Sequence, residues 1–318
     1  MKPWVEKYRP RVIDDMTYQK EISSLMKESI ESGNLPHLIL HGPPGTGKTS
    51  TIHAFSKEVY PRNKKDYLLE LNASDERDIN TVRFKIKEFS KRAIGGDSIC
   101  KFKLVILDEA DTMTIQAQSA LRRIMEDYSN VTRFCLICNY ISKIMSPILS
   151  RCANFRFKTI PVEDMVKRLE YISNQENIRI GKDILVKISE SSGGDMRKGI
   201  FNLQMISIMN DREVDMDNVD DVCGNIPKTL VDNMWKTVDT NIFKESQEFV
   251  NTFILSGFPV EDFLQKIVES VVNNESLGDV SKGIICRHIA VTEKNLIHGC
   301  GEYLQLLDLI GIMMKNNI

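Results

Sequence analysis

The chain has 318 residues, and its 42 Lys and Arg nearly balance its 44 Asp and Glu, which leaves a formal net charge of −2. This length exceeds what one hydrophobic core usually covers, so two or three domains are expected. The balanced charge argues against a free-standing, strongly basic nucleic-acid-binding domain, although it allows a local basic stripe. No stretch has the ~18 uncharged apolar residues of a membrane span, so we expect no membrane partner.

Seven cysteines are scattered along the chain, and their odd number suits a reducing compartment better than a disulfide framework. Cys135 and Cys138 form a C-x-x-C pair inside the apolar run 134–138, and no second pair follows at zinc-ligand spacing. We therefore expect both to be buried as small hydrophobic side chains rather than to bind a metal.

The first predicted elements surround a glycine-rich motif. Residues 1–12 are rich in proline and are predicted to be extended, and 21–32 has the apolar spacing of an amphipathic helix. Residues 38–40 predict a short buried strand, and the pattern G-x-x-x-x-G-K-T follows at 42–49 and leads into a helix. This pattern between a strand and a helix is typical of a phosphate-binding loop, and the context disfavours an ordinary turn beside a lysine.

The phosphate-binding loop needs these residue types for physical reasons. Glycines let backbone N–H groups turn inward around a polyphosphate, and the helix that follows points its positive end at the same anion. Lys48 would reach the β- and γ-phosphates, and the Thr49 hydroxyl would hold Mg²⁺. The candidate nucleotide-binding residues of the loop are Gly42, Pro43, Pro44, Gly45, Thr46, Gly47, Lys48, Thr49 and Ser50.

Strands then alternate with helices. Strands are predicted at 67–72, 102–107, 133–138 and 155–158, and helices at 81–92 and 116–127. This alternation predicts an α/β fold with a parallel five-stranded sheet flanked by helices on both faces. After Pro161 the apolar spacing is helical, with stripes at 165–172, 184–188, 196–206 and 260–272. The expected domains are 1–160, 161–224 and 225–318.

Polar residues end two of the predicted strands. Asp108 and Glu109 follow the strand 102–107, roughly 60 residues after the phosphate-binding loop, and supply the acidic partner that such a loop needs. Asp108 would hold Mg²⁺ next to Thr49, and Glu109 would polarise the water that attacks the γ-phosphate. Asn139 ends the strand 133–138, where a place beside the γ-phosphate and an ordinary strand-end turn are equally good interpretations.

Basic residues at three places have two interpretations each. Arg197 begins a helix that Asp195 would cap, and is either a phosphate ligand or a solvated first-turn arginine. Arg151 would be idle in its own site but could serve an adjacent subunit as an arginine finger. The third set is a solvated helix face by the simpler interpretation, and consists of Arg77, Arg83 and Lys87.

Together these motifs closely resemble the small subunits of the eukaryotic sliding-clamp loader, replication factor C, within the AAA+ ATPases. The matching segments are WVEKYRP (4–10), the phosphate-binding loop, LNASDER (71–77), LDEAD (107–111), ALRR (120–123), CN (138–139), SRC (150–152) and GGDMR (193–197). The match covers the first two expected domains, and the third is consistent in length and helicity.

The resemblance implies an ATPase with an AAA+ domain, a small helical lid and an all-α collar, and with ATP and Mg²⁺ bound at subunit junctions. Asn139 would be sensor 1, Arg197 sensor 2, and Arg151 the finger that acts in trans. The adenine pocket would be lined by Val5, Tyr8, Arg9 and Pro10. The contacts with template-strand phosphates would come from Arg77, Arg83 and Lys87, and would be salt-dependent and independent of base sequence.

The resemblance also implies partners and a location. The chain would act in a hetero-pentamer that opens the sliding clamp (PCNA) and loads it on primer–template DNA, during DNA replication and repair in the nucleus. Residues 111–117 would approach the clamp. Two alternatives remain at this point: a related AAA+ motor, such as a branch-migration or helicase-like homo-hexamer, and a structural loader subunit that binds nucleotide without hydrolysing it.

Overall fold

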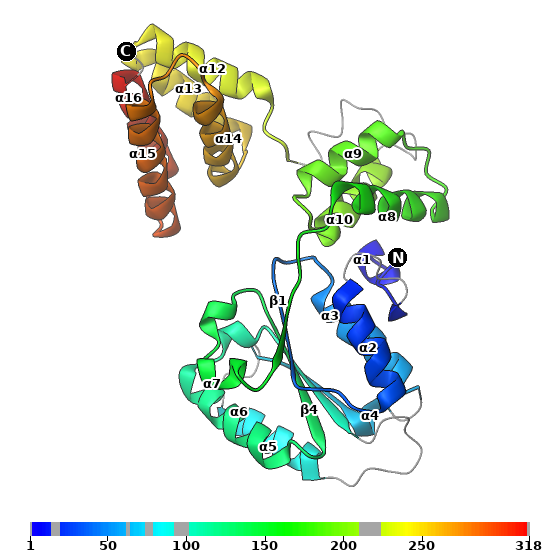
Figure 1. Cartoon of the computed structure of the whole chain (residues 1–318). Coiled ribbons are helices and arrows are strands. Elements are labelled where there is room, and N and C mark those ends of the chain that lie inside the picture. Colours follow the sequence, from blue (N-terminus) through cyan, green and yellow to red (C-terminus); the bar gives the residue numbers. More distant parts are fainter. Residues whose placement is uncertain are drawn as a thin grey trace. The chain divides into compact units, whose positions relative to one another are not determined.

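The computed structural model describes residues 2–13, 20–61, 64–73, 79–91, 102–209 and 224–316. The chain divides into two compact units, Met1–Asp215 and Met216–Ile318. The first unit contains the sheet and the helices up to residue 209, and the described part of the second unit is helical (Figure 1). The expected three-domain boundaries stay predictions.

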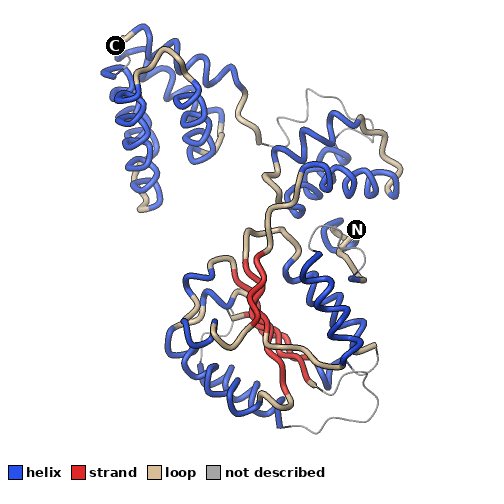
Figure 2. The backbone as a smooth tube through the Cα atoms, viewed as in Figure 1, coloured by secondary structure: helices blue, strands red, loops and turns tan. Residues whose placement is uncertain are grey.

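Five parallel strands form the sheet of the first unit, in the order β2-β3-β4-β1-β5. The sheet is drawn in red in Figure 2. The strands are β1 (Leu38–His41), β2 (Leu68–Asn72), β3 (Lys103–Asp108), β4 (Thr132–Cys138) and β5 (Ala153–Arg156). The predicted α/β fold is confirmed, although β5 lies slightly earlier than expected because Ala153 already pairs with Leu38. In a parallel sheet the carboxyl ends share one edge, so the loops after β1, β3 and β4 are neighbours.

Helices cover both faces of the sheet, with α2 and α3 on one side and α5 and α6 on the other (Figure 1). Their bounds are α2 (Lys20–Ser32), α3 (Lys48–Val59), α5 (Ile79–Lys91) and α6 (Ile115–Tyr128). Leu38 and Leu40 belong to the core under α3, and Ile39 between them to the core on the opposite face. Burial on both faces explains why the central strands are almost continuous apolar runs.

Short elements complete this layer of the first unit. They are α4 (Lys64–Tyr67), α7 (Ser146–Leu149) and the 3₁₀ helices η2 (Ala110–Thr112) and η3 (Ile141–Lys143). Cys135 and Cys138 are buried in the two cores on either face of the sheet, as the sequence predicted. Burial raises the pKa of both thiols, that of Cys138 to about 11, which keeps them protonated at neutral pH.

The N-terminal segment differs from its prediction. Residues predicted to be extended include a short helix, α1 (Trp4–Lys7), in which the N–H groups of Glu6 and Lys7 donate to Pro3 O at 3.1 and 3.0 Å. A proline directly before a helical turn has its φ already restricted and needs no N–H partner, which favours a turn here. The extended prediction was wrong for residues 4–7, because Pro3 precedes a helical turn.

Three further helices of the first unit carry the apolar stripes predicted after Pro161. They are α8 (Val162–Gln175), α9 (Lys182–Ser191) and α10 (Met196–Met209). Leu169, Ile188 and Leu203, one from each stripe, are fully buried. We refer to α8–α10 as the lid helices.

The described part of the second unit consists of five helices around one apolar core. They are α12 (Lys228–Thr240), α13 (Phe243–Ser256), α14 (Val260–Asn273), α15 (Asp279–Ile297) and α16 (Glu302–Asn316). The stripe predicted at 260–272 lies on α14, and its Phe263 stacks on Phe253 with ring centroids 4.3 Å apart. Among the described helices, none combines the length and the hydropathy that crossing a bilayer would require.

Candidate nucleotide-binding site

The phosphate-binding loop joins β1 to α3 at the carboxyl edge of the sheet. Gly42, Gly45 and Gly47 have φ values of 144°, 66° and 94°, which side chains of L-residues rarely allow. A Cβ on Gly42 would lie 2.2 Å from Phe157 O, and one on Gly45 would lie 1.7 Å from Asp195 Oδ1. Both glycines are therefore required by the backbone and by the close approach of neighbouring segments.

Lys48 begins α3 and is only 7% exposed. Its Nζ donates to the carbonyl oxygens of Gly42 and Pro43, each at 2.7 Å, and to Asn139 Oδ1 at 3.0 Å. Burial, and then the nearby Arg197 guanidinium, lower the pKa of Lys48 below its ordinary value. Asn139, which the sequence left between two interpretations, therefore lies next to Lys48.

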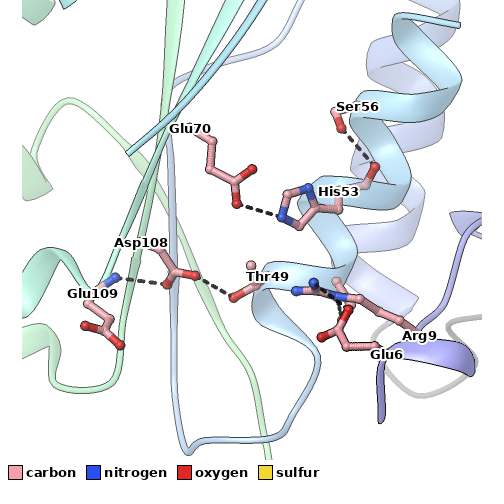
Figure 3. Close-up of polar contacts among 9 residues, drawn as sticks. Glu6, Arg9, Thr49, His53, Ser56, Glu70, Asp108 and Glu109 are labelled. Carbon is pink, nitrogen blue, oxygen red and sulfur yellow. Dashed lines mark hydrogen bonds and ion pairs between the residues drawn. The ribbon is translucent and has the colours of Figure 1, made fainter. Parts of the chain in front are cut away.

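Thr49 and Asp108 come from α3 and from the end of β3, and they face each other (Figure 3). Thr49 Oγ1 donates to Asp108 Oδ2 at 3.0 Å, and Asp108 Oδ1 accepts from the Glu109 N–H at 2.9 Å. Adjacent oxygen ligands of an octahedral Mg²⁺ are about 3 Å apart, so this pair fits the predicted metal site. One turn along α3, His53 pairs with Glu70 of β2 at 2.9 Å and ties the helix to the edge strand.

Glu109 has a left-handed backbone, with φ 53° and ψ 38°. Such a conformation is uncommon outside glycine and costs on the order of 1–3 kcal/mol when a structure holds it in place. Here the Glu109 carbonyl accepts from both the N–H and the hydroxyl of Thr112, at 2.9 and 2.8 Å. The tight turn brings Glu109 to the same pocket as Asp108.

These groups line one pocket, which we call the phosphate pocket. Its lining consists of Pro44, Gly45, Thr46, Gly47, Lys48, Thr49, Asp108, Glu109, Ile137, Cys138, Asn139 and Arg197. The structure thus brings together candidate residues from four separate segments of the chain. Cys138 also lines this pocket, although the sequence placed it only in the core.

A second pocket, which we call the base pocket, adjoins the phosphate-binding loop. It is lined by Val5, Glu6, Tyr8, Arg9, Pro10, Gly45, Gly47, Ser50, Arg168, Met196, Arg197 and Ile200. All four residues predicted for the adenine pocket lie there. Gly45, Gly47 and Arg197 line both pockets, so the two pockets are adjacent parts of one site. The sequence analysis did not assign Arg168, Met196 and Ile200 to this pocket: Arg168 and Ile200 belong to no recognised motif, and in GGDMR (193–197) only Arg197 was given a role.

The lid helix α10 begins directly over the phosphate-binding loop. The N–H of Met196 donates to Gly45 O at 3.2 Å. Asp195 Oδ1 accepts from the N–H groups of Arg197 and Lys198 at 2.7 and 3.2 Å, which is the predicted cap. Arg197 therefore lies in the first turn of a helix whose start is bonded to the loop.

Of the remaining candidate residues, Arg151 and Lys87 line neither pocket. Arg151 is exposed, pairs with Glu126 at 2.6 Å and donates to Pro147 O at 2.8 Å. Lys87 is exposed on α5, whereas Arg77 and the side chain of Arg83 lie outside the described residues. The structure thus supports an outward-facing position for two of these four residues.

A glycine loop around a buried lysine, a threonine–aspartate oxygen pair and a second carboxylate at a parallel sheet edge define a P-loop ATPase with a helical lid. Three successive segments of the chain match known protein families. Residues 38–160 match the ATPase family associated with various cellular activities (AAA), 167–208 match the RCF1/5-like AAA+ ATPase lid domain, and 226–311 match the replication factor C C-terminal domain.

Relatives along nearly the whole chain are clamp-loader subunits. Replication factor C subunit 2 of Saccharomyces cerevisiae is 41% identical over an alignment of 323 residues, gaps included, that covers 97% of this chain and 92% of the relative. Replication factor C subunit 4 of Homo sapiens is 40% identical over 320 residues, covering 98% and 88%. The replication factor C small subunit of Sulfurisphaera tokodaii is 41% identical over 305 residues, and the match covers 95% of this chain and 92% of the relative. The chain belongs to the replication factor C small subunits, the AAA+ ATPases of clamp loaders.

The solved structures include a more distant neighbour. The Thermotoga maritima RuvB Holliday junction branch migration motor has a TM-score of 0.55 at 16% identity, and the match covers 73% of this chain and 80% of that one. An identity this low shows the shared AAA+ fold alone. The clamp-loader prediction is confirmed over the branch-migration alternative, because the three relatives described above, at 40–41% identity, are replication factor C subunits.

Proposed function

We propose that this chain is a hydrolysing small subunit of a nuclear, hetero-pentameric clamp loader. It binds ATP and Mg²⁺, helps to open the sliding clamp (PCNA) and loads it on primer–template DNA in replication and repair. The observation that carries the proposal is the convergence of Lys48, Thr49, Asp108, Glu109 and Asn139 on one pocket. The eukaryotic relatives in clamp loaders support the assembly and the location.

Each residue of the phosphate pocket has a role that its position supports. Lys48 would exchange its bonds to the loop carbonyls for bonds to the β- and γ-phosphates. Thr49 and Asp108 would hold Mg²⁺, which neutralises phosphate charge when bound. Glu109 would accept a proton from the attacking water, and Asn139 would orient Lys48 toward the γ-phosphate.

Two arginines would link this chemistry to conformation and to assembly. Arg197 would contact the γ-phosphate and so couple nucleotide state to the position of α10, whose first N–H already bonds Gly45. Arg151 would enter the site of an adjacent subunit and stabilise the charge of the transition state. Isolated chains would then turn over slowly, because their finger must come from another subunit.

The partner surfaces are proposed from the resemblance, and the exposed positions of Lys87 and Ile115 support them. Lys87, with Arg77 and Arg83, would follow the template-strand phosphates. Residues 111–117 would approach the clamp, and Ile115 in this segment is 75% exposed, which suits an apolar contact with another protein.

The test uses a reconstituted loader in which the ATP sites of the other subunits are inactivated, so that turnover reports on this subunit alone. Glu109→Gln is then introduced into this subunit. We expect DNA- and clamp-stimulated turnover to fall by about 10²–10⁴-fold, with ATP binding retained. Glu163→Gln, the same change at an exposed position on α8, is the matched control. Unchanged turnover in Glu109→Gln would reject Glu109 as the water-activating residue, and a single-component hexamer in native mass spectrometry would contradict the hetero-pentamer.

A further inference from the structure

The N-terminal segment lines the base pocket with Val5, Glu6, Tyr8, Arg9 and Pro10, and its residues 4–8 bond to the lid helices. Lys7 Nζ and Tyr8 Oη both donate to Glu176 Oε1, each at 2.6 Å. Arg168 Nη2 donates to the Tyr8 carbonyl at 2.8 Å. Near the start of the segment, the Trp4 N–H donates to Gln204 Oε1 at 3.1 Å. These contacts join segments that are far apart in the sequence.

The position of Glu176 favours a role for its side chain in these contacts. Glu176 is the C-terminal cap residue of α8, and its backbone N–H donates to Ile172 O at 3.0 Å. The helix dipole disfavours a negative charge at this end, so the carboxylate itself does not stabilise the helix. Its side chain is only 19% exposed, and two donors at 2.6 Å compensate the carboxylate. Burial and then the Glu176 bond raise the pKa of Tyr8, so its hydroxyl remains a donor at neutral pH.

The same segment is bonded to the sheet layer just beyond Tyr8. Arg9 Nε donates to Ser50 Oγ at 3.3 Å, and the Ile13 N–H donates to Glu58 Oε1 at 2.9 Å, both on α3. Residues 4–8 are therefore held by the lid helices and residues 9–13 by the helix that follows the phosphate-binding loop. The wall of the base pocket is correctly placed only while both sets of contacts persist.

We propose that Glu176 and Arg168 are positioning residues that hold residues 5–10 against the base, so that affinity for adenine depends on the lid. This inference rests on the proposed function, because it assumes that ATP binds with its base in the base pocket. Affinity for the phosphates does not depend on Glu176, since Lys48 and Thr49 belong to the sheet layer. The contact thereby makes recognition of the base conditional on the arrangement of the lid helices.

The experiment compares ligands that share phosphates but differ in the base. Binding of ADP, GDP and inorganic pyrophosphate to the full chain is measured by calorimetry for wild type, Glu176→Ala and Glu176→Gln. We expect Glu176→Ala to weaken ADP binding about tenfold, which is the loss of roughly one charge-assisted hydrogen bond, and to reduce the preference for ADP over GDP. Pyrophosphate binding should stay unchanged. Glu176→Gln, which keeps an acceptor for Tyr8, should restore part of the affinity.

Three further variants make each outcome decisive. Glu170→Ala, an exposed glutamate on the same helix, is the matched control and should leave all three affinities unchanged. Tyr8→Phe removes one hydroxyl, and its effect should not add to that of Glu176→Ala, because both break the same bond. Lys48→Ala should weaken ADP and pyrophosphate alike.

The possible failures are distinguishable. Unchanged ADP binding in Glu176→Ala, or an equal loss for ADP and pyrophosphate, would overturn the positioning role and leave the proposed function intact. Wild-type chains that bind neither ADP nor pyrophosphate, or that bind both equally well with and without Lys48, would overturn the nucleotide site itself.

Discussion

The two compact units of this protein bury different kinds of side chain. In the described part of the first unit, polar and charged groups such as Lys48, Thr49, Lys103 and Gln118 are buried. In the described part of the second unit, the buried polar groups are Ser246 and Thr292, within a core that is otherwise apolar. Burying polar groups is unfavourable unless they are hydrogen-bonded. Lys48 and Thr49 line the phosphate pocket, whereas Lys103 and Gln118 donate to backbone carbonyls of neighbouring segments.

The difference predicts that stability and activity can be damaged separately. Each unit contains one of the two tryptophans, Trp4 in the first and Trp235 in the second. Replacing either tryptophan by phenylalanine would allow fluorescence to follow the unfolding of one unit at a time. The following predictions use these single-tryptophan backgrounds.

The largest effect is expected in the apolar core. Phe263 is fully buried and stacks on Phe253, so Phe263→Ala should destabilise the second unit by about 3–5 kcal/mol through lost burial and a cavity. Urea unfolding followed at Trp235 measures this loss, and ADP binding by the first unit should be unchanged. Phe243→Ala, at 59% exposure in the same unit, is the matched control. If Phe263→Ala also weakened ADP binding by the first unit, the separation of stability and activity between the two units would be contradicted.

The next effect is expected in the phosphate pocket. Lys48→Met should lower kcat/KM for ATP in the assembled loader by about 10²–10³-fold, because one preorganised donor to the transferring phosphoryl group is lost. Steady-state turnover measures the effect, and unfolding followed at Trp235 should not change. Lys57→Met, exposed on the same helix, is the control. Unchanged turnover in Lys48→Met would show that Lys48 does not contribute to ATP hydrolysis.

A smaller effect is expected where the lid meets the loop. Asp195→Ala removes the cap of α10 and should destabilise the first unit by about 0.5–2 kcal/mol, measured by unfolding followed at Trp4. It should also raise the ATP concentration needed for half-maximal turnover, because Arg197 would be less well held. Asp183→Ala, exposed in the first turn of α9, serves as the comparison. A loss of stability with no change in nucleotide affinity would limit Asp195 to a structural role.

The smallest effect is a pH dependence confined to the first unit. Burial, and then Arg133, lower the pKa of His37 from 6.5 to about 4, and His37 Nδ1 accepts from the Phe134 N–H. Below pH 6.5 His37 is protonated in the unfolded chain, whereas in the folded chain it is protonated only below about pH 4. The free energy of unfolding therefore falls as the pH drops through this window. The half-buried ring reduces the expected loss to about 1 kcal/mol.

His37→Gln tests this pH dependence, because glutamine keeps an acceptor for Phe134 and does not titrate. Unfolding followed at Trp4 should depend less steeply on pH in the variant between pH 6.5 and 4, and the two slopes should coincide above pH 7. Identical slopes throughout would show that His37 does not contribute.

The parts of the site that follow a strand could be predicted from the sequence. Asp108, Glu109 and Asn139 follow apolar runs, and Lys48 and Thr49 end the glycine loop that follows another. A parallel sheet brings the segments after its strands to one edge. The resemblance to known clamp-loader subunits supplied the residues of the base pocket that carry no local pattern of their own. The sequence left the position of Asn139 open, and only the tertiary structure places it beside Lys48.

The lid side of the site could not be predicted in this way. Arg168 and Ile200 look like ordinary helix residues, and Glu176 looks like a solvated helix end. The helical turn at Trp4–Lys7 and the left-handed backbone of Glu109 were also missed, since both depend on hydrogen bonds rather than on residue type alone.

The sequence by itself determined the α/β sheet, the phosphate-binding loop, the acidic strand end and the helical second unit, because hydrophobic period and glycine placement act over a few neighbouring residues. Only the tertiary structure decided which lid residues meet the base pocket and which side chain holds the N-terminal segment. Tyr8 and Glu176 are separated by 168 positions, and their contact depends on how whole helices pack, which no local pattern encodes.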